Sequence, residues 1–92
     1  MRKETALNII SNILLLIEEH NQKHVYHANS CEFLTGRYIK LEQALLHNTD
    51  DLIELLEWNK WFAPRIIYEG IGDKDLLCEI EKLDIILSDE LS

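Results

Sequence analysis

The sequence predicts an all-α protein, a small up-and-down bundle of about four helices. Leu, Ile and Glu are abundant and Val occurs once, so the alternation of β-branched residues that is typical of strands is absent. Three Gly and one Pro leave few positions for turns. Apolar residues recur at steps of three and four, which is the period of a helix. Because 92 residues can form one small hydrophobic core, we expect residues 1–92 to make a single helical domain.

The first helix is expected to begin near Glu4 or Thr5. Nine of the twelve residues from Ala6 to Ile17 are apolar, and the three polar residues cluster on one narrow strip. An apolar arc this wide can contact neighbours on two sides. We therefore expect a central helix, or a helix shared with a second subunit, and predict a homodimer.

The apolar row of this helix continues into the next segment, and two structures fit it. One is a single helix of about 40 residues from Glu4 to Leu46, a length that is uncommon outside coiled coils. The other, which we favour, has a turn near Ala28-Asn29-Ser30, with Asn29 or Ser30 capping a second, antiparallel helix. Gly36 in this second helix indicates a close approach between helices. The row consists of Ile9, Ile13, Leu16, His20, His24, His27, Cys31, Leu34, Tyr38, Leu41 and Leu45.

Two further helices are predicted in the second half of the chain. Thr49 is expected to cap the third helix, whose first turn is acidic. Pro64 kinks or splits this helix, because its ring removes an amide hydrogen. The segment Gly70-Ile71-Gly72 is expected to separate the third helix from the fourth, and Asp73 is expected to cap the fourth helix. The predicted core consists of Ile10, Ile13, Leu14, Ile17, Leu34, Leu41, Leu45, Leu52, Leu56, Phe62, Leu76, Ile80 and Leu83.

The net charge of −8 lies entirely in the second half of the chain. Residues 1–46 carry five acidic and five basic residues, whereas residues 47–92 carry twelve acidic and four basic residues. The acidic half would repel nucleic acids and anionic membranes, and the neutral half would not attract them, so we expect neither as a partner. A protein with a basic surface is the natural complement.

We expect a cytoplasmic protein. Residues 1–3 and the aliphatic run after them resemble a signal peptide, but an acidic pair follows that run without a small-residue cleavage site. The longest uninterrupted apolar run, Ile13 to Ile17, is too short to cross a bilayer. Cys31 and Cys78 are therefore expected to be free thiols.

His20, His24, His27 and Cys31 are spaced four, three and four residues apart, which places them on one stripe of a helix. Imidazole and thiolate are common zinc ligands. On a continuous helix His20 and Cys31 would lie about 16 Å apart along the axis, so only a pair could share one ion. We favour the simpler interpretation that these side chains end a core row near solvent, with no cofactor. A zinc or other transition-metal site, or a pH-sensitive interface, is the alternative.

A second cluster, between residues 58 and 65, is typical of a partner surface. Trp58, Trp61 and Arg65 share one face of a helix, and Trp and Arg are enriched at binding hot spots. Glu54 and Glu57 on the same helix can steer a basic partner. The alternative is that a small domain needs both indoles in its core.

The sequence contains no motif for nucleophilic catalysis or for a nucleotide-binding loop, so we do not expect an enzyme. The leading hypothesis is a non-catalytic, cytoplasmic protein-interaction module, such as an inhibitor, an immunity-type protein or a regulator. Its acidic C-terminal half would dock on a basic protein. A metal-binding or metal-sensing bundle and a self-associating structural domain are the alternatives.

Overall fold

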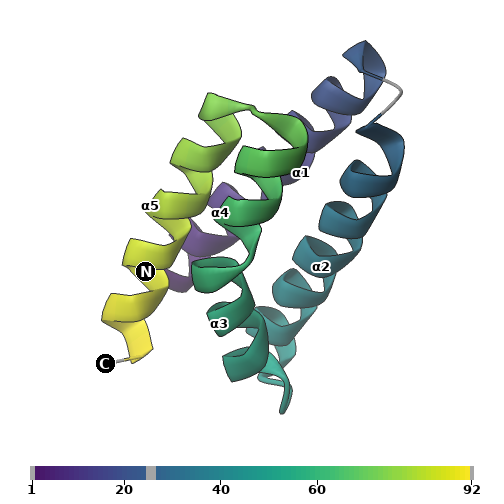
Figure 1. Cartoon of the computed structure of the whole chain (residues 1–92). Coiled ribbons are helices and arrows are strands. Elements are labelled where there is room, and N and C mark those ends of the chain that lie inside the picture. Colours follow the sequence, from purple (N-terminus) through teal and green to yellow (C-terminus); the bar gives the residue numbers. More distant parts are fainter. Residues whose placement is uncertain (1, 25–26, 92) are drawn as a thin grey trace.

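The computed structural model describes residues 2–24 and 27–91, with side chains for residues 3–24 and 27–88. Throughout these residues the regular structure is helical and contains no strand, which confirms the all-α prediction. The elements, shown in Figure 1, are α1 (Arg2–Lys23), α2 (Ala28–His47), α3 (Leu52–Trp61), α4 (Ala63–Ile66), the π-helical segment η2 (Ile67–Ile71) and α5 (Lys74–Leu91).

Helix α1 makes the most extensive helix–helix contacts of the described residues, against α5 and against α2. Helix α3 also contacts both α2 and α5. The elements α4 and η2 continue from α3 towards the start of α5 (Figure 1). The end of α1, the start of α2 and the start of α5 thus lie at the same end of the molecule. The wide apolar arc of α1 accounts for its contacts, since it is buried on two sides.

The two-helix interpretation of residues 4–46 is confirmed, and the single long helix is wrong. Helix α1 ends at Lys23 and α2 begins at Ala28. The turn lies slightly earlier than predicted, because residues 28–30 already form the first turn of α2. Neither Asn29 nor Ser30 is the cap; His27 is, without a side-chain hydrogen bond to the helix. The amide of His27 instead bonds the carbonyl of His24 at 2.9 Å. Residues 25 and 26 of the connection lie outside the described residues.

The predicted third helix is divided into three successive elements, α3, α4 and η2. The first break falls at Phe62, two residues before Pro64, which lies in the first turn of α4. Pro64 cannot donate to the carbonyl four residues before it, and its ring crowds that carbonyl. At the N-terminal end of α3 the cap is Asp51 rather than Thr49, and the Thr49 hydroxyl donates to the Asp51 carboxylate.

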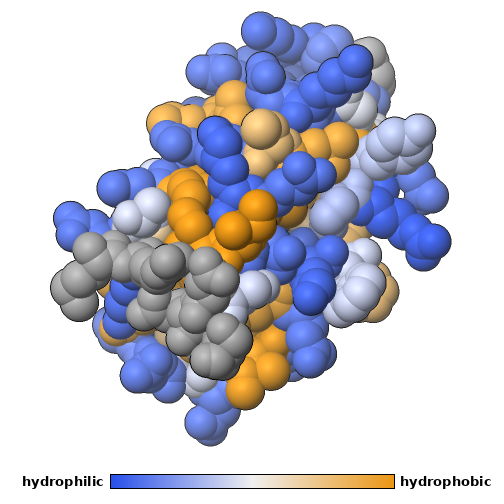
Figure 2. Space-filling view, turned by 90° about the vertical axis from the view of Figure 1, so that its left-hand side faces the viewer, coloured by the Kyte–Doolittle hydropathy of each residue, from blue (hydrophilic) through white to orange (hydrophobic). Residues whose placement is uncertain are grey.

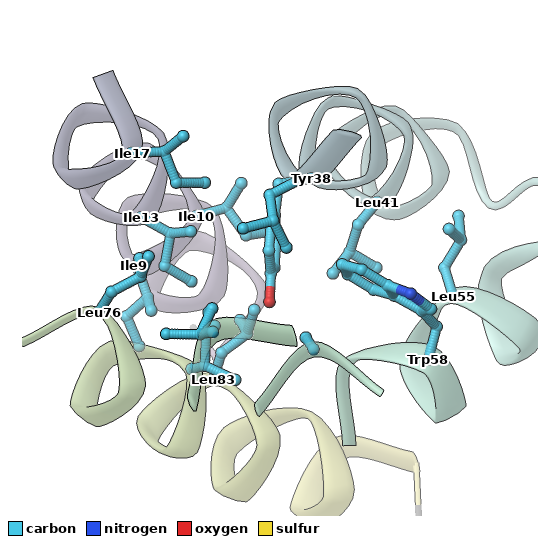
Figure 3. Packing of buried hydrophobic residues seen from close by; sticks show 14 of the residues in the cluster. Ile9, Ile10, Ile13, Ile17, Tyr38, Leu41, Leu55, Trp58, Leu76 and Leu83 are labelled. Atoms are coloured by element: carbon cyan, nitrogen blue, oxygen red, sulfur yellow. The ribbon is translucent and has the colours of Figure 1, made fainter. Parts of the chain in front are cut away.

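Most of the predicted core is buried (Figure 3). Leu14, Leu52 and Leu56 are half-buried at its edge. Phe62 was predicted in the core, but its side chain is 57% exposed, because the break before Pro64 turns it away from the apolar face of α3. The fully buried large side chains are Ile10, Ile13, Ile17, Leu34, Tyr38, Leu41, Leu55, Asn59, Ile67, Leu76, Ile80 and Leu83.

The close helix approach predicted at Gly36 is wrong. Gly36 is exposed on α2, and a Cβ atom built there has no neighbour within 4 Å. Among the described residues no other helix comes close to this position, so the missing side chain serves no contact there.

The surface on the α5 side is mainly polar and is interrupted by apolar side chains (Figure 2). None of the described helices combines the length and the apolar character needed to cross a membrane. Cys31 is buried, Cys78 is exposed and both are free thiols, as predicted. The single domain and the homodimer stay predictions.

Candidate functional site

A groove of about 410 Å³ lies between α2 and the segment α3–α4. Three of the five residues predicted to bind a partner, Glu54, Glu57 and Trp58, meet in it. Trp61 and Arg65, the other two, are exposed and are not among its described lining residues. We call this site the aromatic groove; its lining residues are Phe33, Arg37, Glu54, Glu57, Trp58, Phe62 and Ile66.

Trp58 forms the floor of the aromatic groove and does not project from it. Its ring meets the edges of Tyr38 and Phe33, with centroids 5.3 Å and 6.3 Å away, and only 7% of the residue is exposed. The guanidinium of Arg37 lies 5.6 Å from the ring centroids of both Phe33 and Trp58. Trp58 therefore belongs to the core, whereas Trp61 is exposed, so the alternative interpretation that both indoles lie in the core is right for Trp58 alone.

Trp61 stands on the outer surface of α3 and is 67% exposed. The ammonium of Lys60 lies 5.4 Å from its ring centroid. Ile53, eight residues earlier in α3, and Tyr68 in η2 are also exposed. The acidic half of the chain thus carries several large apolar side chains in contact with solvent.

The three predicted metal-binding histidines come together at the end of α1 and the start of α2. Nε2 of His20 lies 2.8 Å from Nδ1 of His27, and the two ring planes differ by 4°. Their centroids are 5.1 Å apart, so the rings meet edge to edge through a hydrogen bond. The ring of His24 lies beside both, with centroids 4.6 Å from His20 and 5.8 Å from His27. We call these three side chains the imidazole cluster.

Asp73 connects the imidazole cluster to α5. Its Oδ2 lies 3.8 Å from Nδ1 of His20, while its Oδ1 accepts a 3.2 Å hydrogen bond from the amide of Leu76 and caps the helix, as predicted. The local fold makes this contact possible, because Gly72 adopts a φ of 72° and ends η2 through a 2.6 Å bond from its amide to the carbonyl of Ile67. This turn places the carboxylate of Asp73 against His20.

Burial lowers the pKa of His20, and the neighbouring rings of His24 and His27 lower it further. The carboxylate of Asp73 opposes this shift, whereas Lys23 adds to it. The net effect favours the neutral imidazole, which is the form that can accept a hydrogen bond or bind a metal ion.

Cys31, the fourth residue of the predicted metal set, lies elsewhere. It lines a separate cavity of about 560 Å³ with Leu14, Ile17 and Ile39, and burial raises the pKa of its thiol. Across residues 3–24 and 27–88, no three His, Cys, Asp or Glu side chains are placed to hold one metal ion as they stand. The imidazole cluster is closed by the hydrogen bond between His20 and His27.

Two features of these sites were not predicted from the sequence. The pairing of Phe33 with Arg37 in the aromatic groove has a local signal, since the two are four residues apart on α2. The contact of Asp73 with His20 has none, because it depends on how α5 packs against α1. Comparisons with models of protein families, with curated proteins and with solved structures found no match to this chain.

Proposed function

We propose that this chain is a non-catalytic, cytoplasmic protein-interaction module of the inhibitor, immunity or regulatory kind. It binds a basic segment of a partner protein in the aromatic groove. One observation supports this most directly: the groove has apolar walls, with Phe33 48% and Phe62 57% exposed, and the carboxylates of Glu54 and Glu57 beside them. Apolar rings next to unburied carboxylates suit a Lys or Arg side chain of the partner.

The chemistry of the groove favours a cation in particular. Arg37 already places its guanidinium over Phe33 and Trp58, so an incoming cation is drawn to Glu54 and Glu57 instead. The two negative charges of these carboxylates exceed the one positive charge of Arg37. An incoming Lys or Arg side chain can lay its aliphatic stem on Phe33 and Phe62 and direct its charge to Glu54 or Glu57. Such contacts give specificity beyond simple charge attraction.

The distribution of charge supports a basic partner as well. The entire net charge of −8 belongs to residues 47–92, which include α3, α4 and α5. The resulting field increases the rate of encounter with a positively charged protein and weakens as salt is added. Trp61 and Arg65 lie outside the groove and extend the proposed contact along α3 and α4. Trp58 supports the groove from below.

The test uses a labelled chain and a short amphipathic peptide that alternates Arg and Leu. In heteronuclear NMR spectra, the peptide should shift the amide signals of Phe33, Glu54 and Phe62 more than those of α5. The double variant Glu54→Gln/Glu57→Gln should bind about tenfold more weakly, which corresponds to the loss of roughly 1.4 kcal/mol. The matched control, Glu69→Gln/Glu81→Gln, removes the same charge from exposed positions of the acidic half.

Equal weakening by the two double variants would show that net charge, and not the groove, attracts the peptide. Shifts spread evenly over the surface would contradict the proposal in the same way. Replacing Arg by Glu in the peptide should abolish the response, since the proposed contact is between opposite charges.

A further inference from the structure

The rings of the imidazole cluster have the mutual separations of imidazoles bound to one ion. Their centroids lie 4.6 Å, 5.1 Å and 5.8 Å apart. Three imidazoles bound tetrahedrally at 2.0–2.1 Å hold their centroids about 5 Å from one another. We propose that His20, His24 and His27 bind one divalent transition-metal ion of the zinc, nickel or copper class. This site is independent of the aromatic groove.

Binding requires a small rearrangement of side chains. Nε2 of His20 and Nδ1 of His27 are 2.8 Å apart, whereas two nitrogens of a tetrahedral zinc site are about 3.3 Å apart. The pair must therefore open by about half an ångström, and His24, whose ring is tilted by 36° and 37° to the other two, must rotate. The ion takes the place of the proton between His20 and His27, and this proton moves to the other ring nitrogen of the imidazole that donated it, so that both ligands stay neutral.

Asp73 supplies a carboxylate next to the ring nitrogen of His20 that points away from the cluster. Ligating imidazoles commonly direct their second nitrogen at a carboxylate, which fixes the orientation of the ring. Nε2 of His20 faces the cluster, and its Nδ1 faces Oδ2 of Asp73 at 3.8 Å. The carboxylate is itself held in place, because its other oxygen caps α5.

The surroundings of the cluster suit a cation that enters from solvent. A polar cavity of about 370 Å³ opens beside His20 and His24. Three carboxylates and two ammonium groups line it, so the negative groups exceed the positive ones. These are Glu19, Asp73 and Asp75, opposed by Lys23 and Lys74. Water from this cavity can fill the fourth position on the metal.

The ligand set selects the class of metal. Imidazole nitrogens suit zinc, copper and nickel, whereas magnesium and calcium need several oxygen ligands. Cys31 takes no part, because its thiol lines a different cavity between α1 and α2. An ion held here joins the end of α1 to the start of α2 and, through Asp73, to α5.

The test is calorimetric titration of the untagged, chelator-treated chain with Zn²⁺, supported by the visible absorption of Co²⁺. One ion per chain should bind, and a chelator should remove it. His24→Ala and His27→Ala should each weaken binding at least tenfold. His47→Ala is the matched control, because His47 is exposed in the last turn of α2 at the other end of that helix.

A second variant separates ligand binding from folding. Asp73→Asn keeps a side-chain oxygen for the cap of α5 but removes the charge that faces His20. It should fold as the original chain does, by circular dichroism, and weaken Zn²⁺ binding by about 10–100-fold. Unchanged affinity in His24→Ala, or equal loss in His47→Ala, would overturn the proposal. So would the absence of any heat or Co²⁺ absorption in a folded chain.

Discussion

The hydroxyl of Tyr38 donates a 2.6 Å hydrogen bond to Oδ1 of Asn59, and this bond joins α2 to α3 inside the core. Both residues are almost completely buried. Burial raises the pKa of Tyr38, so the hydroxyl keeps its proton and can donate. Among the described residues, Nδ2 of Asn59 is buried without a hydrogen-bond partner. Asn59 thus depends on Tyr38 for the hydrogen bond to its side-chain oxygen.

Replacing the tyrosine tests this dependence. Tyr38→Phe keeps the ring against Trp58 but leaves Oδ1 of Asn59 unpaired as well. A buried polar group without a partner costs about 1–3 kcal/mol, so the free energy of unfolding should fall by that amount. Urea denaturation followed by circular dichroism measures the change.

The double variant Tyr38→Phe/Asn59→Leu provides the control. Removing both partners and filling the site with apolar atoms is nearly neutral in favourable cases. The double variant should therefore be more stable than Tyr38→Phe alone. A double variant that is less stable than Tyr38→Phe would mean that Asn59 makes another contribution.

The two glycines at Gly36 and Gly72 should respond to alanine in opposite directions. Apart from the adjacent backbone, no atom of the described residues lies within 4 Å of a Cβ built at either site, so steric overlap does not distinguish them. Gly36 lies within α2, where alanine is favoured by about 1 kcal/mol, and Gly36→Ala should raise the thermal midpoint. Gly72 has a φ of 72°, where a Cβ costs about 1–2 kcal/mol, and Gly72→Ala should lower it. Changes of the same sign would contradict this difference in backbone geometry.

The helices could be predicted because burial in a bundle follows local periodicity. The row from Ile13 to Leu45 is buried except at Leu16, His24 and His27, which are half-buried. The cap at Asp73 follows from one residue type. The exposure of Phe62 could not be predicted, because it depends on where the chain breaks before Pro64. Periodicity alone does not distinguish a kink from two separate helices.

The candidate sites were predicted in part, for a similar reason. Spacing brought His20, His24 and His27 to one stripe, and they do contact one another. Spacing also added Cys31, which the chain turn between α1 and α2 directs to a different cavity. The rotation of α3 against α2, which buries Trp58 and exposes Trp61, is a property of packing and leaves no mark in the local sequence.

Leu83 and Ile85 lie on opposite faces of α5, one towards the core and the other towards solvent. Leu83 is fully buried, whereas Ile85 is 63% exposed. Leu83→Ala removes apolar contacts and leaves a cavity, so it should destabilise the fold by about 2–5 kcal/mol. Ile85→Ala should change stability by no more than about 0.5 kcal/mol. Thermal or urea denaturation of both variants measures the difference, and a large loss in Ile85→Ala would show that the outer face of α5 is covered in solution.

The two thiols should differ in reactivity because one is buried and the other is exposed to solvent. Cys78 is exposed on α5, whereas Cys31 is buried and the pKa of its thiol is raised. Because the thiolate is the reactive form, a thiol reagent such as Ellman's should modify Cys78 in the native chain and reach Cys31 only after urea unfolds it. The Cys78→Ser variant should therefore show almost no native reaction, while Cys31→Ser should react as the original chain does. Rapid native reaction of Cys78→Ser would indicate that the cavity between α1 and α2 opens readily to solvent.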